Sequence, residues 1–340
     1  MKILWILIFC CFPISCDVEE LKEKFDEEEE ESEAVNSTVV KRSGSTSQDY
    51  DLDTVDDIRV FMFGNSLLVH EHTPEPSEGK KVPHWLSLFS LQDQVSFRVD
   101  GRYGFMRDYS DFSELGPQWG FAQAERLWTD EETPFADVSF NRIIYTPTNF
   151  VQYQAPGEAY YDDASTSPLS TTLDTLDQVW QAHPGIPIMI YEGWPDMAGY
   201  GNFPEEVDLS RYYADTQESF HQWFINYHNE LERLRPDETI AVIPVGPILV
   251  KILQLAGIRD LDIQALFEDD APHGQVTLYF LASLITYSAL FQRQIPENYT
   301  IPNEINSVVA SNYDVIGNLI WDELNSFKDS ANKSRVFLNP

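Results

Sequence analysis

The stretch IRVFMFGNSL, residues 58–67, joins a short β-branched and aromatic run to a glycine turn and a serine. The run Ile58–Phe63 is typical of a buried strand and predicts the first strand of the fold. A serine that leaves such a strand through a tight turn at Gly64 can present its hydroxyl above the edge of the sheet. Ser66 is therefore the first candidate for a reactive group, with a simple helix cap as the structural alternative.

Strand-like and helix-like stretches alternate from Ile58 onward. The further expected strands are 94–99, 142–145, 186–191 and 239–245. The expected helices are 83–91, the segment carrying the stripe Leu169, Leu173, Leu176 and Trp180, and 220–234, 275–292 and 305–327. Such alternation predicts an α/β fold, a three-layer αβα sandwich around a central, mostly parallel five-stranded sheet. Reactive groups in these folds gather beyond the carboxyl ends of the strands.

The charge balance is strongly acidic, with 56 acidic and 22 basic residues and a formal net charge of −34 among 340 residues. So few lysines and arginines argue against nucleic acid as a partner, because there is no surplus of cations to replace phosphate counterions. The balance also disfavours anionic membrane surfaces and is typical of a soluble protein in an extracellular setting. Apolar residues make up 43% of the chain, which is enough for a sizeable core.

The first 16 residues are predicted to be a signal peptide, because Lys2 precedes the apolar run Ile3–Ile14, which is too short to span a bilayer. The three cysteines of the chain all lie in or beside this run. Cleavage near Cys16 gives a secreted or periplasmic protein, with no membrane insertion after the signal is removed. The alternative is lipid attachment at Cys16 as a lipoprotein, against which Pro13 occupies a position where an aliphatic residue is usual.

Residues 17–57 form an acidic segment that is predicted to be disordered, since runs of carboxylates such as Glu27–Glu31 repel one another. Two interpretations are open: a solvated spacer, or a pro-segment removed after the dibasic pair Lys41-Arg42. The domain that carries the function is then expected to span residues 58–340.

A second candidate group lies near the other end of the chain, in the sequence Asp269-Asp270-Ala271-Pro272-His273. Asp270 and His273 are three residues apart, a spacing that lets the carboxylate fix the imidazole tautomer and leaves the other nitrogen to take a proton. A capping aspartate and a surface histidine are the structural alternative. Serine, aspartate and histidine at opposite ends of an alternating α/β pattern together point to nucleophilic catalysis.

Gly64-Asn65-Ser66-Leu67 resembles the first block of the SGNH/GDSL hydrolase superfamily, with asparagine in place of the usual aspartate, and Asp270-x-x-His273 resembles its fifth block. The resemblance covers residues 58 to about 293. It implies a flavodoxin-like sheet, a Ser66–His273–Asp270 triad and an oxyanion hole. The implied oxyanion donors are the Ser66 N–H, a glycine N–H after the second strand, and an asparagine amide after the third.

The second and third oxyanion donors match the superfamily less closely. Gly104 is the expected glycine and Gly101 the alternative, and either can be an ordinary turn residue. Asn149 is the expected amide, although Pro147 stands where the superfamily has glycine, so the local backbone must differ.

The segment Tyr191–Met197 directly follows the fourth expected strand and should border the crevice. Trp194 is predicted to stack on a sugar face, with Glu192 or Asp196 bonding hydroxyl groups. Trp128 is open to the same interpretation, or to a place in the core. No metal and no other cofactor is expected, since neither a His-Glu-x-x-His pattern nor a glycine-rich phosphate loop occurs.

These features predict an exported serine esterase that hydrolyses an acyl ester, preferably an acetyl ester on a carbohydrate. The alternatives are a lipid or short-chain ester hydrolase, an acyltransferase with the same triad, and a non-catalytic carbohydrate-binding protein on the same scaffold. The expected partner is a small-molecule or carbohydrate ester.

Overall fold

The computed structural model describes residues 55–69, 79–112, 115–116, 121, 124–147, 154–271 and 273–338. These residues lie within one compact unit, Thr46–Pro340. The predicted signal peptide, most of the acidic segment and the predicted oxyanion residue Asn149 lie outside the described residues.

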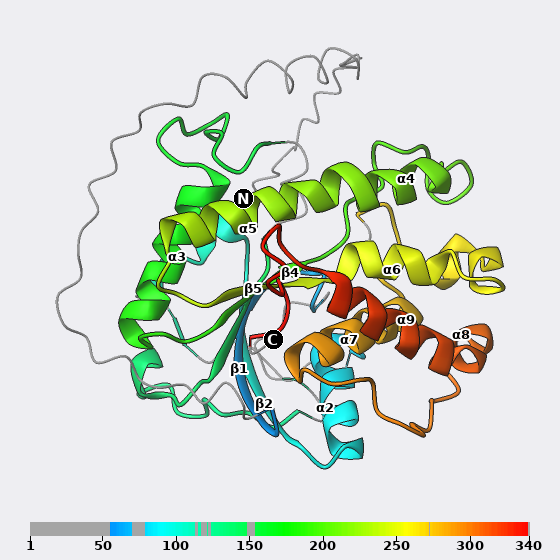
Figure 1. The fold of residues 1–340 in the computed structure, drawn as a ribbon, viewed down its shortest axis with the longest axis horizontal. Helices are drawn as coiled ribbons and strands as arrows, with labels where there is room; N and C mark the ends of the chain where they lie inside the picture. The colour runs from blue at the N-terminus through cyan, green and yellow to red at the C-terminus, as the bar shows by residue number, and fades with distance from the viewer. Residues whose placement is uncertain are drawn as a thin grey trace, which may run out of the picture. The chain divides into compact units, whose positions relative to one another are not determined.

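Five parallel strands form the central sheet (Figure 1). They are β1 (Asp57–Gly64), β2 (Ser96–Tyr103), β3 (Arg142–Tyr145), β4 (Ile188–Glu192) and β5 (Ile240–Pro244). Their spatial order is β2-β1-β3-β4-β5, the order of flavodoxin-like folds. All residues of β3, β4 and β5 are buried, because helices cover both faces of the sheet. The predicted α/β fold class is therefore confirmed.

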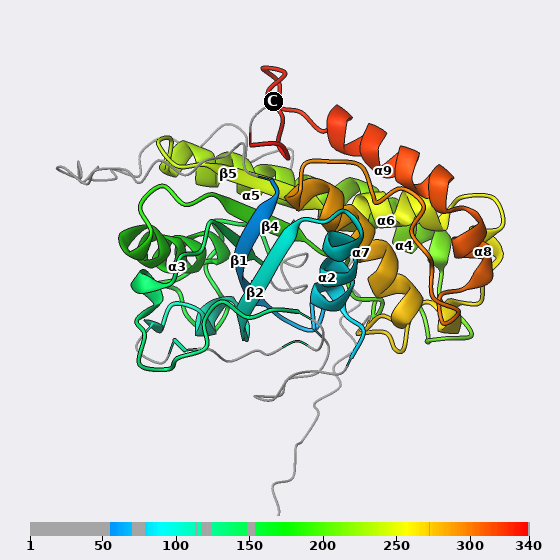
Figure 2. The same cartoon turned by 90° about the horizontal axis from the view of Figure 1, so that it is seen from below.

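Two hydrophobic cores lie on opposite faces of the sheet because alternate strand residues point to opposite sides. Helices α3 (Pro168–Ala182) and α5 (His221–Leu234) pack on one face (Figure 1). The other face carries α2 (Val82–Gln92), α6 (Val245–Leu253), α7 (Val276–Leu290) and α9 (Tyr313–Ser326), which Figure 2 shows together. The shorter helical segments are α4 (Leu209–Asp215), α8 (Ser307–Ser311), the π-turn Thr216–Phe220, and the 3₁₀ turns Met106–Asp108, Phe135–Asp137, Ile258–Asp260 and Ile263–Ala265.

Helix α6 was not predicted, because its apolar run follows β5 directly, without a polar break between them. The glycine near its start, Gly246, is required by packing. A Cβ at Gly246 would lie 2.1 Å from the carbonyl oxygen of Gly193, so only glycine lets the start of α6 touch the loop after β4. This contact presses the loop after β4 against the core beneath the candidate site.

Both edges of the sheet are paired with irregular segments. At the β5 edge the Val242 N–H donates to the Arg335 carbonyl at 2.7 Å, and at the β2 edge the Val99 N–H donates to the Glu125 carbonyl at 2.9 Å. The buried Asp100 carboxylate holds the second segment through the Leu127 and Trp128 N–H groups. These pairings protect both edges of the sheet from pairing with another chain.

Candidate active site

The turn after β1 presents Ser66 at the point where the strand order reverses between β1 and β3. The Asn65 carbonyl accepts from the Leu68 and Val69 N–H groups at 3.0 Å, and its side-chain oxygen accepts from the Leu67 N–H at 3.0 Å. Asn65 and Leu67 are buried, whereas Ser66 is half-buried. The neighbours of Ser66 in this turn are therefore packed in the core, and Ser66 is the residue of the turn that stays partly exposed.

His273 is held by Asp269, one residue away from the predicted partner Asp270. The Nδ1 atom of His273 lies 2.7 Å from Asp269 Oδ2, and Asp269 Oδ1 accepts from the N–H groups of Ala271 and His273 at 3.1 and 3.0 Å. Asp270 is exposed, and its carbonyl accepts from the Met197 N–H at 2.8 Å. The prediction of Asp270 is thus corrected to Asp269.

The Asp269 carboxylate is suited to holding an imidazolium. Partial burial raises its pKa, but the hydrogen bonds and charge of His273 and the backbone N–H groups outweigh burial and lower the pKa overall. The carboxylate therefore stays ionised and fixes Nδ1 as the bonded nitrogen. Proton exchange at this ring would then involve Nε2.

Tyr279, on α7, connects the serine turn with the histidine segment. Its hydroxyl donates to the Ser66 carbonyl at 2.6 Å, and its ring lies so close to Gly274 that a Cβ there would be 3.0 Å from the ring. Gly274 directly follows His273. Burial keeps the pKa of the Tyr279 hydroxyl well above its ordinary value, so it is a permanent donor. No sequence pattern indicates this role, because α7 reads as a uniformly apolar helix.

Of the three predicted oxyanion donors, the Gly104 N–H is already used in a backbone hydrogen bond. It donates to the Gly64 carbonyl at 3.0 Å and so extends the pairing of β2 with β1. The alternative, Gly101, lies inside β2 in register with Met62. Both glycines therefore serve the sheet, which corrects that part of the prediction. The Ser66 N–H stays a prediction, as does Asn149.

The residues predicted to line the crevice after β4 are buried. Trp194 is 1% exposed and packs at 64° against the Tyr279 ring, and Glu192 is fully buried. Asp196 is also buried, and its carboxylate accepts from the Ala198 N–H at 3.2 Å. A sugar cannot reach side chains in these positions, so the prediction of a subsite at Trp194, Glu192 and Asp196 is wrong. Trp128 is likewise a core residue.

Glu192 forms a buried ion pair with His221. His221 Nδ1 lies 2.8 and 3.0 Å from the two carboxylate oxygens. Burial raises the pKa of Glu192, with His221 opposing the shift. Burial lowers the pKa of His221, and so do the nearby cations Lys251 and Arg335. The charge and hydrogen bond of Glu192 outweigh these effects and raise the pKa overall. The pair fixes α5 to the end of β4.

Breaking this pair should have a large effect on stability. Glu192→Leu leaves His221 buried without its anion and is expected to lower the free energy of unfolding by roughly 3–5 kcal/mol. The double variant Glu192→Leu/His221→Phe should recover most of that loss. The pKa of His221 is raised on folding, so its contribution to stability is fully present below the ordinary value of 6.5 and is lost as pH rises through the raised value. The raised pKa of Glu192 acts in the same direction, because ionising the buried carboxyl above its ordinary value of 4.5 costs stability. Urea unfolding from pH 6 to 9 measures both effects. A double variant as unstable as the single, or no alkaline loss, would contradict this account.

Tyr279→Phe should separate positioning from stability. The lost hydrogen bond is expected to lower kcat for a small ester by about 2–10-fold with little change in KM, since it corresponds to about 0.5–1.5 kcal/mol. Tyr313→Phe is the matched control, because that buried hydroxyl also donates to a carbonyl, that of Pro296 at 3.0 Å. Equal stability losses with kcat reduced only in Tyr279→Phe are the expected result. Equal kcat in both variants would remove the positioning role.

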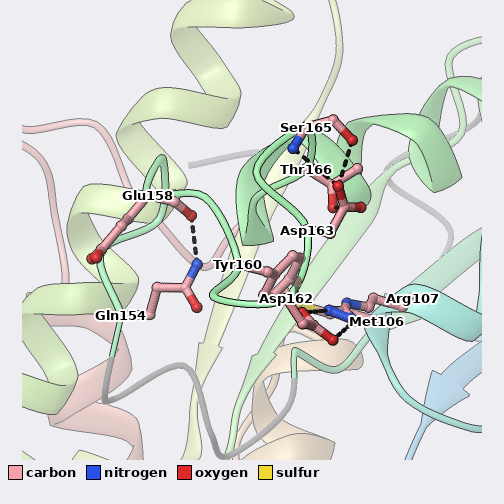
Figure 3. Close-up of polar contacts among 9 residues, drawn as sticks. All are labelled: Met106, Arg107, Gln154, Glu158, Tyr160, Asp162, Asp163, Ser165 and Thr166. Carbon is pink, nitrogen blue, oxygen red and sulfur yellow. Dashed lines mark hydrogen bonds and ion pairs between the residues drawn. The ribbon is translucent and has the colours of Figure 1, made fainter.

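The loops at the carboxyl edge beside β2 and before α3 are tied together, as Figure 3 shows. Arg107 forms a two-bond ion pair with Asp162 and lies over the Tyr160 ring, 4.3 Å from its centroid. Asp163 accepts from the Ser165 hydroxyl at 2.5 Å, from the Thr166 hydroxyl at 2.6 Å and from the Ser165 N–H at 3.0 Å. These three hydrogen bonds lower the pKa of Asp163 to about 2. These contacts make an ordered rim that sequence patterns did not reveal.

Among the described residues, no group of three or more His, Cys, Asp and Glu side chains could hold a metal ion. None of the helices in that part of the chain is both long and apolar enough to cross a membrane.

Comparison with known proteins bears on the fold alone. No family model matches the sequence, and no curated protein matches it significantly. A crystal structure of a DUF4886 family protein from Bacteroides uniformis is similar in fold, with a TM-score of 0.52 and 13% sequence identity. The match covers 83% of this chain and 98% of that one. This protein therefore shares the α/β architecture of that structure over most of its length.

Proposed function

We propose that the protein is an exported serine hydrolase that cleaves an acyl ester, with an acetyl group on a carbohydrate as the preferred substrate. The observation that carries the proposal is the Asp269–His273 pair at 2.7 Å, on a segment that Tyr279 joins to the Ser66 turn. A histidine oriented by an ionised carboxylate and a serine at the switch point of the sheet are the groups that nucleophilic catalysis by a hydroxyl requires.

In the proposed reaction the Ser66 hydroxyl attacks the ester carbonyl while Nε2 of His273 takes its proton. Asp269 holds Nδ1 and stabilises the imidazolium that forms. The Ser66 N–H and the Asn149 amide are the proposed donors to the oxyanion. His273 returns the proton to the leaving alcohol, and a water molecule activated by the same histidine then releases the acid and restores Ser66. If another alcohol replaces this water, the same residues perform acyl transfer.

One observation favours a non-catalytic alternative, a carbohydrate-binding protein on this scaffold. The Gly104 N–H is engaged by Gly64, so one of the expected oxyanion donors is occupied. Losing one such donor typically costs about 10²–10³ in kcat, which weakens a hydrolase but does not abolish its chemistry.

Hydrolysis of p-nitrophenyl acetate, butyrate and octanoate by residues 43–340 tests the proposal. Activity that is highest for acetate is expected. A preference for octanoate would favour a lipid esterase instead. If neither these esters nor acetylated polysaccharides are hydrolysed, the binding-protein alternative replaces the esterase.

A further inference from the structure

A polar cavity of about 310 Å³ lies between the start of α2 and the start of α7. It is lined by Lys80, Lys81, Glu268, Gln275, Val276 and Glu304. Its volume is at the low end of ligand pockets, which run from about 300 to 1,000 Å³. The cavity, which is open to solvent, therefore has room for a single small ring.

The walls of this cavity belong to the segments that build the candidate active site. The Lys81 ammonium lies 4.6 Å from the centroid of the Tyr279 ring, and the Tyr279 hydroxyl donates to the Ser66 carbonyl. On the other side, the Glu268 N–H donates to the His273 carbonyl at 2.7 Å. Gln275 follows His273 by two residues. A group bound in the cavity is thus in contact with segments that hold both the nucleophile and the base.

The lining combines donors and acceptors whose formal charges cancel. Two lysines face two glutamates, and the Lys80 ammonium lies 2.5 Å from Glu304 Oε2. The Gln275 amide adds both a donor and an acceptor. An anion would be repelled by the glutamates and a cation by the lysines, while an alkyl chain would displace water from these charged groups. Several neutral hydroxyl groups can bond to both kinds of side chain.

We propose that this cavity is the subsite for the alcohol part of the ester, and that it takes one neutral, polyhydroxylated ring, such as a sugar residue. This proposal rests on the proposed esterase activity. It replaces the predicted subsite around Trp194, which is buried, with a different set of residues. Lys80, Gln275 and Glu304 then determine specificity without taking part in the bond-breaking step.

The test compares three acetyl esters: a methyl glucoside monoacetate, cyclohexyl acetate, and p-nitrophenyl acetate as the measure of basal activity. Lys80→Met is expected to lower kcat/KM for the glucoside ester by about 10–100-fold, and Gln275→Leu by about 2–10-fold, the values for lost charged and neutral hydrogen bonds. Hydrolysis of p-nitrophenyl acetate, which carries no sugar hydroxyl, should fall by a smaller factor than hydrolysis of the glucoside ester in both variants. A glucuronide monoacetate should be a poorer substrate than the neutral glucoside ester.

Lys251→Met is the matched control, because Lys251 forms an equivalent pair with Glu323 at 2.6 Å, between α6 and α9 and outside the cavity lining. A second readout is the binding of methyl glucoside to the Ser66→Ala protein, with and without Lys80→Met, measured by saturation-transfer NMR.

Cleavage of the sugar ester that is equally fast in Lys80→Met and Lys251→Met would overturn the subsite and leave the proposed esterase activity unaffected. Glucoside binding that Lys80→Met removes, in a protein that cleaves no ester, would support the subsite and overturn the esterase. A preference for cyclohexyl or glucuronide ester would overturn the proposed specificity.

Discussion

Ser66→Ala is expected to lower kcat for p-nitrophenyl acetate by about 10⁶-fold, because removal of the nucleophile abolishes the acyl-enzyme route. The substitution removes one oxygen from a half-buried side chain in a turn that Asn65 holds through its own carbonyl and side chain. Stability should therefore stay within about 0.5 kcal/mol of the parent protein. Steady-state kinetics together with thermal unfolding measures both quantities.

His273→Ala should cause a loss of the same order, and the double variant Ser66→Ala/His273→Ala should be no less active than either single one. Groups that act as a unit are strongly non-additive, since the second removal takes away nothing that still functions. Ser165→Ala is the matched control, a serine in the rim whose hydroxyl bonds Asp163. Losses that multiply in the double variant would show that the two residues act separately.

The second large effect distinguishes two neighbouring carboxylates. Asp269→Asn is expected to lower kcat by about 10⁴-fold, because an amide can donate to Nδ1 and so stabilise the wrong imidazole tautomer. Asp270→Asn should change kcat by less than about threefold, since that side chain is exposed and only its backbone carbonyl, bonded to Met197, is fixed. The two variants remove the same charge from adjacent positions, so each controls for the other.

Steady-state kinetics of both variants beside the parent protein measures this ranking. The reverse ranking of the two variants would restore Asp270, the residue that the sequence motif predicts.

The sheet could be predicted because its strands are short apolar runs separated by longer amphipathic stretches. The expected 142–145 strand coincides with β3, and the run Ile58–Phe63 lies within β1. The same criterion failed for α6, whose apolar run follows β5 without a polar break. The close contact of its start with Gly193 is likewise a tertiary feature that no local pattern records.

The site was predictable in its residue types but not in every position. A motif predicts that an aspartate precedes His273 by a few residues, but the turn decides which one reaches Nδ1. Here the N–H groups of Ala271 and His273 both point to Asp269 and bring its side chain to the ring.

Trp194 illustrates the opposite error. A position after a strand places a residue at the functional edge, but the direction of its side chain depends on the loop. A Cβ at Gly193 would lie 2.5 Å from the Leu67 side chain, so the loop after β4 packs tightly under the Ser66 turn and Trp194 enters the core. The polar cavity beside Tyr279 is formed by segments far apart in sequence, which explains why no pattern indicated it.

Reaction of the protein with a fluorophosphonate tests most directly whether Ser66 is an activated nucleophile, because the probe needs no knowledge of the natural substrate. Mass spectrometry of the intact chain and of its peptides should find one adduct per molecule, located on Ser66 and absent from His273→Ala. An adduct on another residue, or labelling of Ser66 that does not depend on His273, would contradict the account.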